Sequence, residues 1–214
     1  MASTRPMEVK PLATINAGNI RRLTAIAVTV ALAILLGFIR LYRLPWGGSL
    51  SLKILPLVYL AIKHGPKAGL LGGLATGLVT LILDPVLLHP IQVGLDYLLP
   101  YAFLGVIGFF PSRPRMGILV AGILRLASHV VSGAVYFAAF MPAGLNQQIY
   151  DIVRDYTGIT LPLILQSWTA PWIYAILYNA SLVIPETIIM MIIVPPLIHR
   201  INQGSFPTVM TKIE

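Results

Sequence analysis

Long, continuously apolar blocks constrain the fold of this sequence more than any other feature. The blocks are the stretch LTAIAVTVALAILLGFI and, approximately, residues 53–64, 67–85, 92–111, 117–140 and 171–198. About 20 apolar residues cross a bilayer as a helix that satisfies its own backbone hydrogen bonds. Membrane strands would instead alternate apolar and polar residues. The blocks therefore predict an all-α, polytopic membrane protein with six transmembrane helices, of which the second is short and contains Pro56.

The composition supports a surface that is covered by lipid. Charged residues make up 10% and hydrophobic residues 57% of the 214 residues, and the mean hydropathy is +0.85. Soluble domains contain about 25% charged residues, so this chain has too few ionic groups to build a water-facing surface. It has no cysteine, which excludes disulfides, thiolate metal sites and cysteine nucleophiles. We expect no metal and no cofactor.

The basic residues give the predicted helices an orientation. One side of the membrane is predicted to collect most of them: Arg5, Lys10, Arg21, Arg22, Lys63, Lys67, Arg113, Arg115, Arg200 and Lys212. The other side collects Arg40, Arg43, Lys53 and Arg154. Cytoplasmic loops are enriched in Lys and Arg, so both termini are predicted to be cytoplasmic, in the inner membrane of a prokaryote. Topology thus accounts for the net charge of +8, and no nucleic-acid partner is expected.

The same reasoning divides the chain into three parts. Residues 1–20 are predicted to form a cytoplasmic N-terminal tail, residues 21–200 the six-helix domain and residues 201–214 a cytoplasmic C-terminal tail. Within the domain, residues 141–170 form the longest segment between predicted spans and lie on the outer side. We expect this segment to fold into a short surface helix or a lid.

Four ionisable residues lie within the predicted spans: Asp96, Arg125, His129 and Glu186. Such groups cost at least about 2.5–3.5 kcal/mol on insertion scales, so each one is a functional-site hypothesis. The structural alternative is an internal ion pair between Arg125 and either Asp96 or Glu186. Both interpretations stay open at this point.

Helical spacing brings polar and aromatic side chains together near the outer halves of three helices. Gln92 and Asp96 lie on one helical face, because residues four apart are neighbours. The other members are Arg125, His129, Gly133 and Phe137 at the same spacing, Tyr136 beside them, and Tyr174, Tyr178 and Asn179 in the last span. This mixture suits a flat, hydrogen-bonding, cationic ligand that stacks on aromatic rings and meets a carboxylate. For the tyrosines, an interfacial aromatic belt is the alternative.

The first predicted span carries a small-residue pattern, Ala27-Val-Thr-Val-Ala31. Small residues at this spacing let another helix approach closely, so we expect Ala27 and Ala31 to face a partner. The sequence contains no HExxH, GxSxG or Walker motif. Any energy for transport must therefore come from an ion gradient or from a partner.

Several segments, taken in order, resemble the S-components of energy-coupling factor (ECF) transporters, and most closely the thiamine-specific ones. The similar segments are SLSLKILPLVYLAIKHGPKAGLLGGLATGL, IQVGLDYLLPYAFLGVIGFF, RLASHVVSGAVYF and WIYAILYNAS. They correspond to the second and third, the fourth, the fifth and the sixth helix of that family. The resemblance runs from about residue 21 to 200, except for the segment 141–170.

The resemblance implies a substrate-binding subunit of a vitamin importer that performs no covalent chemistry. It implies that Asp96 replaces a family Glu that hydrogen-bonds an aminopyrimidine ring, that Tyr97 is the neighbouring aromatic residue and that Phe137 replaces a stacking Trp. The other positions that match the family are Gln92, His129, Tyr174 and Asn179. The first helix is then expected to dock on a transmembrane coupling subunit driven by two ATPases. Outer loops, including the one with Trp46, are expected to occlude the ligand.

Three alternatives remain open. The chain could be an S-component for a different vitamin, since Asp96 and Phe137 depart from the thiamine pattern. A self-sufficient ion-coupled carrier would use Asp96 or Glu186. A membrane enzyme would use His129 with a carboxylate as general base, although no nucleophile or metal cluster accompanies it in the sequence.

Overall fold

The computed structural model describes residues 17–44, 48–160 and 162–203. Its helical elements are α1 (Ala17–Phe38), α2 (Ile54–His64), α3 (Pro66–Leu83), α4 (Pro90–Val93), η1 (Gly94–Leu98), α5 (Leu99–Ala102), η2 (Phe103–Phe109), α6 (Pro114–Tyr136), η3 (Ala138–Phe140), α7 (Leu145–Thr157) and α8 (Leu163–Asn202). Of these, η1 is a π-helical turn, and η2 and η3 are 3₁₀ segments. A two-stranded antiparallel hairpin, β1 (Arg40–Arg43) and β2 (Ser49–Ser51), lies between α1 and α2 in the sequence.

Five stretches of the described residues are long and apolar enough to cross a membrane: Gly18–Phe38, Pro66–Leu83, Pro90–Phe109, Pro114–Tyr136 and Trp168–Ile201. The sixth apolar helix, α2, has 11 residues, which at 1.5 Å per residue cover roughly half of the hydrocarbon core of a bilayer. The predicted all-α, polytopic architecture is confirmed. The hairpin that precedes α2 is an element that the apolar pattern did not predict.

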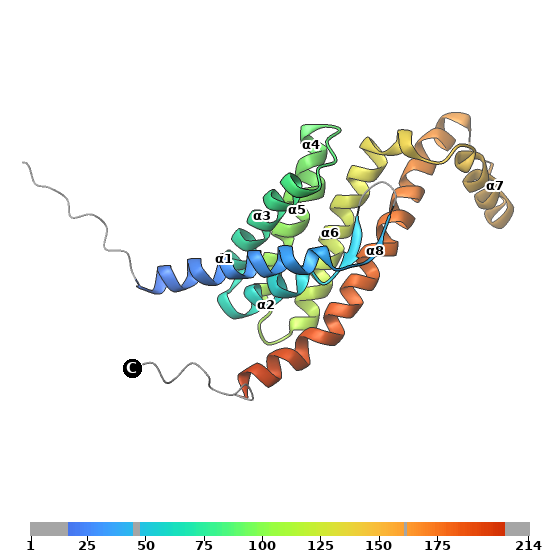
Figure 1. The fold of residues 1–214 in the computed structure, drawn as a ribbon. Helices are drawn as coiled ribbons and strands as arrows, with labels where there is room; N and C mark the ends of the chain where they lie inside the picture. Colours follow the sequence, from blue (N-terminus) through green and yellow to red (C-terminus); the bar gives the residue numbers. More distant parts are fainter. Residues whose placement is uncertain (1–16, 45–47, 161, 204–214) are drawn as a thin grey trace, which may run out of the picture.

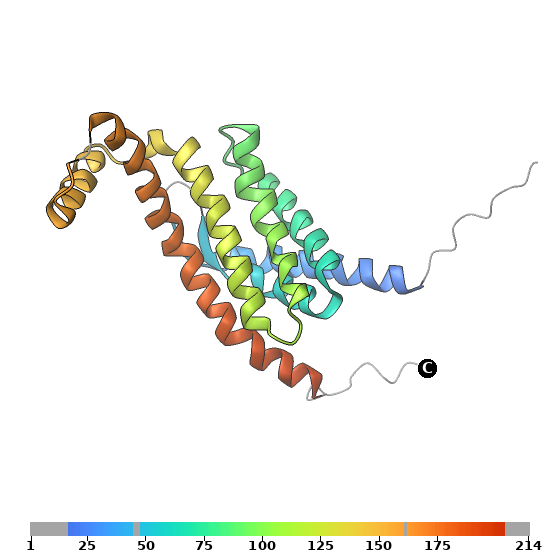
Figure 2. The ribbon, with the colours of Figure 1, turned by 180° about the vertical axis from the view of Figure 1, so that it is seen from behind.

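The helices form a bundle with one crossing member. The Pro90–Phe109 stretch packs against α3 and α6, and α6 packs against α8 along much of its length (Figures 1 and 2). Across α2 and α3, α1 runs at a steep angle to the other long helices (Figure 1). The longest helix, α8, has 40 residues and contains four prolines, and its axis curves beside α6.

The basic ends of the helices gather at one end of the bundle. Near the start of α1, the Arg22 guanidinium donates a hydrogen bond to the His64 carbonyl at the end of α2, at 3.4 Å. At the start of α6, Arg115 donates to the Met191 carbonyl of α8 at 3.5 Å. The main core lies toward this end, where Leu57 and Met190 are fully buried. That this end faces the cytoplasm stays a prediction.

Glycines allow α3 to pack at backbone distance against the Pro90–Phe109 stretch. A Cβ atom at Gly73 would collide with the Tyr101 carbonyl, and one at Gly77 would collide with the Tyr97 carbonyl. Small residues permit this close approach between membrane helices. The glycine seam therefore fixes the position of the stretch that carries Gln92 and Asp96.

We predict that Gly73→Ala destabilises the fold, because the added methyl group meets the backbone of a neighbouring helix and forces the two apart. Overpacking of this kind costs about 1–3 kcal/mol. The measurement is the thermal unfolding midpoint of the purified protein in detergent. Gly94→Ala is the matched control, since a Cβ there would meet nothing within 4 Å. Equal midpoints for the two variants would contradict the close packing of the seam.

Candidate functional site

A cavity of about 190 Å³ lies between the hairpin, the Pro90–Phe109 stretch, α6 and α8. It brings together the principal candidate residues from the sequence, which all line it: Gln92, Asp96, Tyr97, His129, Phe137, Tyr174 and Asn179. Two of the secondary candidates, Arg125 and Tyr178, also line the cavity. Helical spacing, and for Tyr97 the family resemblance, therefore pointed to side chains that three separate stretches of the chain place around one space.

The Asp96 carboxylate is the centre of the polar wall. Its Oδ2 accepts hydrogen bonds from Gln92 Nε2 and Ser132 Oγ, both at 2.7 Å, and its Oδ1 lies 3.2 Å from His129 Nδ1. A carboxylate can only accept, so the last contact places a proton on Nδ1 and leaves Nε2 of a neutral imidazole as an acceptor. Among the described residues no Lys or Arg side chain is paired with Asp96, and Arg40 and Lys53 line the same cavity without contacting it.

A backbone contact with the preceding loop fixes the orientation of the Gln92 side chain. Its side chain is fully buried, and its Oε1 accepts a hydrogen bond from the Leu88 backbone N–H at 3.2 Å. With the oxygen engaged there, the amide nitrogen must face Asp96. Ser128 makes a related bond on the next helix, donating to the Leu95 carbonyl at 2.6 Å. These contacts hold the carboxylate at the cavity wall.

A π-helical turn sets the register of Asp96. Pro100 has no N–H to donate to the Asp96 carbonyl four residues earlier, so the regular α-helical bond is absent at this point. The Leu99 N–H bonds instead to the Gly94 carbonyl, five residues earlier. Such single π turns are frequent at functional sites. The sequence signal was Pro100 itself, which follows Asp96 at the spacing that disrupts the helix.

Arg125 pairs with Glu186, which decides between the two partners considered from the sequence. Arg125 NH2 lies 2.8 Å from Glu186 Oε2, and both side chains are more than nine-tenths buried. The Nε of Arg125 has no hydrogen-bond partner among the residues that the structure describes. Both residues line the cavity, but their charges neutralise one another. Asp96 is thus left for another role.

Asn179 joins α8 to α6 at the aromatic wall. Its Nδ2 donates to the Ala175 carbonyl at 2.9 Å and to the His129 carbonyl at 3.3 Å. Gly133 makes this contact possible, because a Cβ there would lie 3.0 Å from Ala175 Cβ and 3.2 Å from Asn179 Nδ2. The glycine therefore makes room for α8, in addition to the space beside His129 that its spacing suggested.

The aromatic candidates divide into two groups. The rings of Tyr174 and Tyr178 pack together with centroids 5.6 Å apart, and both line the cavity, as does Phe137. Tyr136 instead stacks on the His89 ring at 5.1 Å and is not among the lining residues. A side chain next to a functional stripe is rotated about 100° away from it, which explains this difference.

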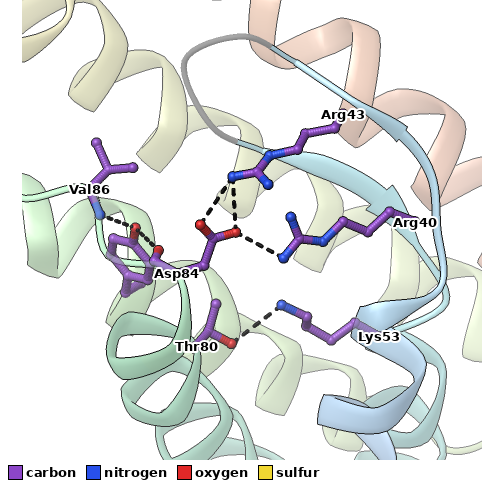
Figure 3. A network of polar contacts seen from close by, with 7 residues as sticks. Arg40, Arg43, Lys53, Thr80, Asp84 and Val86 are labelled. Carbon is purple, nitrogen blue, oxygen red and sulfur yellow. Dashed lines mark hydrogen bonds and ion pairs between the residues drawn. The ribbon is translucent and has the colours of Figure 1, made fainter.

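The hairpin closes one side of the cavity through a network that the sequence analysis missed (Figure 3). The Asp84 carboxylate, at the end of α3, receives Arg40 at 3.0 Å and Arg43 at 3.1 Å. Beside it, Lys53 Nζ donates to Thr80 Oγ1 at 3.4 Å. The available signal in the sequence was the opposite charge of Arg40 and Arg43 on one side and of Asp84 on the other. Spacing within one helix cannot reveal a contact between separate segments. Lys53, expected in an outer loop, in fact lines the cavity.

Tyr97 has a positioning role in this network. Its hydroxyl accepts a hydrogen bond from the Val86 N–H and donates one to the Asp84 carbonyl, both at 2.8 Å. The ring lines the cavity while the hydroxyl holds the loop after α3. The remaining candidate, Trp46, lies outside the described residues.

The comparisons with known proteins point to one family, the thiamine transporters. A family model described as thiamine transporter protein matches residues 23–169. The thiamine transporter ThiT of Bacillus subtilis is 31% identical over 191 residues, which are 80% of this chain and 87% of that protein. ThiT of Lacticaseibacillus paracasei is 23% identical over 125 residues, 49% of this chain and 62% of that protein. A solved structure of ThiT from Listeria monocytogenes has the same fold, with a TM-score of 0.55, 23% identity and coverage of 79% of this chain and 98% of that chain.

We predict that Glu186→Gln strongly lowers the thermal unfolding midpoint, because it leaves the Arg125 guanidinium buried without a carboxylate. Breaking a buried pair from one side costs about 3–5 kcal/mol, whereas replacing both partners by apolar residues is often neutral. The double variant Arg125→Met with Glu186→Leu should therefore recover most of the loss. Asp155→Asn, at an exposed ion pair, serves as the control and should change the midpoint little. A double variant as unstable as Glu186→Gln would contradict a mainly structural pair.

Proposed function

The chain belongs to the thiamine transporter protein family, and from that membership we propose that its cavity binds thiamine or a related pyrimidine-containing vitamin. It is a substrate-binding S-component in the bacterial cell membrane, with several membrane-spanning helices. Its relatives are transporters, so the chain is a transport protein and not an enzyme. The alternative in which His129 acts as a general base is therefore set aside.

The observation that carries the proposal is the Asp96 carboxylate at the cavity wall, which has no Lys or Arg partner among the described residues. Thiamine has a permanent positive charge on its thiazolium ring and an exocyclic amino group on its pyrimidine ring. A carboxylate whose protein partners are neutral donors can accept from such an amino group and balance a cation at the same time. Asp96 can also accept through Oδ1 when His129 turns toward the ligand. The buried Arg125–Glu186 pair adds no net charge that would oppose this binding.

The aromatic residues that line the cavity supply the second set of contacts that we propose for the ligand. Phe137, Tyr174 and Tyr178 also line the cavity, and flat heterocycles gain stacking and cation–π contacts from such rings. His129 Nε2, an acceptor in the tautomer that the Asp96 contact requires, can receive a ligand donor. Asn179 lines the same cavity, and we assign it to the edge of a ligand ring.

We predict that the purified chain binds thiamine and that Asp96→Asn weakens this binding by at least about tenfold. Hydrogen bonds to charged groups contribute about 1.5–3 kcal/mol, and the amide removes both the charge and one acceptor. Titration calorimetry in detergent measures the affinity. Asp151→Asn, which removes an exposed carboxylate on α7, is the matched control and should bind normally.

Two results would count against the site or its ligand. Unchanged affinity in Asp96→Asn would remove Asp96 from the contact set. Absence of binding in a wild-type protein that unfolds cooperatively would exclude thiamine, and the same titration with other pyrimidines and vitamins would then identify the ligand class.

We further propose that release into the cell requires a transmembrane coupling subunit and two ATPases of the ECF type. The first helix supports this proposal, because Ala27 and Ala31 lie on its exposed side while Ile26 and Ala33 are buried against the bundle. A small-residue surface that faces lipid can receive a second helix closely. The loop between β1 and β2, which contains Trp46, is proposed to occlude the ligand from the outside.

We predict that Ala27→Trp prevents assembly with the coupling subunit and leaves thiamine affinity unchanged, because the indole fills the docking surface far from the cavity. Co-purification with a tagged coupling subunit measures assembly. Leu32→Trp places the same ring on another exposed side of α1 and should assemble normally. Uptake of thiamine by this chain alone in sealed vesicles, without any ATPase, would contradict the coupled mechanism and favour an ion-driven carrier.

A further inference from the structure

The helix α7 lies between α6 and α8 in the sequence and projects from the bundle beside the start of α8 (Figures 1 and 2). Its apolar residues recur at helical spacing and form one stripe: Leu145, Ile149, Ile152, Val153 and Tyr156. The polar residues Gln147 and Arg154 lie on the opposite side. A helix with this pattern requires an apolar surface along the whole stripe.

The protein covers only part of the stripe. Ile149 is buried against α8, but Ile152 is 57% and Tyr156 is 88% exposed. Ile159, directly after the helix, is 56% exposed. The apolar side thus continues beyond the surface that α8 offers, and something outside the described chain must cover it.

The charged side of α7 does not attach the helix to the bundle. Arg154 pairs with Asp155 at 2.9 Å and with Asp151 at 3.2 Å, and Gln147 donates to Asp151 at 3.1 Å. In the part of the chain that the structure describes, the ion pairs of α7 are all internal to it. These residues satisfy one another in a way that suits a face in water.

Exposed apolar side chains also occur on α8, the helix that α7 contacts. Toward the start of α8, Trp168 and Trp172 are 69% and 40% exposed. Tryptophan and tyrosine prefer the boundary between headgroups and acyl chains. With 40 residues, α8 is roughly twice as long as a bilayer requires, so its first turns extend to the boundary where α7 is attached.

We propose that α7 is an interfacial helix that lies in the outer headgroup layer and buries Ile152 and Tyr156 at the acyl-chain boundary. Its partner is the lipid surface itself. The ionised residues Asp151, Arg154 and Asp155 give α7 no positive charge excess, so apolar burial and not attraction to anionic lipids holds it there. Because α7 connects the outer ends of α6 and α8, this contact fixes the mouth of the cavity at the membrane surface.

The absence of cysteine from the chain makes a direct test possible. Single-cysteine variants Ile152→Cys and Tyr156→Cys place a spin label on the stripe, and Gln147→Cys is the matched control on the opposite side. Each labelled full-length chain is reconstituted into phosphatidylcholine vesicles at high lipid-to-protein ratio. Collision with oxygen, which concentrates in lipid, is compared with collision with a water-soluble nickel chelate.

We expect the oxygen-to-nickel collision ratio to be several-fold higher at residues 152 and 156 than at residue 147, and unchanged when anionic phosphatidylglycerol is added. Equal, water-like ratios at the three positions would overturn the proposal, as would low collision with both reagents on the stripe, which would mean that protein covers it. A ratio that rises only with anionic lipid would also overturn it. Cooperative thermal unfolding of each labelled variant, with a midpoint close to that of the unlabelled chain, shows that the fold is retained.

Discussion

An ionised carboxylate within a membrane-embedded bundle is the constraint on which the cavity depends. Three side chains from two stretches of the chain, Gln92, His129 and Ser132, converge on Asp96 there. Gln92 is oriented by a backbone N–H, and the glycine seam on α3 fixes the helix that carries both residues. The hydrogen bonds to Asp96 and the backbone packing of α3 therefore depend on one another, and together they form one wall of the cavity.

The charges of the bundle are sorted into pairs with different roles. Arg125 and Glu186 neutralise one another in the interior, and Asp84 joins the hairpin to α3 through Arg40 and Arg43. Asp96 alone among these carboxylates has no cationic partner in the described structure apart from a histidine. In a medium of low dielectric constant, an unbalanced charge attracts a ligand of the opposite sign more strongly than it would in water. Of these three carboxylates, Asp96 is therefore the one that we propose meets a cationic ligand.

Helical periodicity predicted the membrane spans and the neighbours within a single helix. It did not predict contacts between separate helices or the elements that connect them. Apolar blocks of the required length gave the membrane spans, and spacing of four placed Gln92 beside Asp96. The alternative partners of Arg125 were not separable, because distance between helices is not encoded in spacing along one of them. The hairpin and the Asp84 network were not predicted from the sequence, for the same reason. Tyr97 was expected at the ligand because of a resemblance, yet its hydroxyl holds a loop, a role that only tertiary contacts reveal.

The short length of α2 has a consequence for the size of the cavity. Its first turn, at Lys53 and Ile54, lines the cavity, and the strand residues Ser49 and Ser51 line it just before the helix begins. The cavity thus borders the junction at which the hairpin ends and the short helix begins. Moving the start of this helix by one turn would lengthen or shorten the cavity at this wall by about 5.4 Å, while the other helices keep their packing. The position of this single junction therefore limits the size of the molecule that the cavity can hold.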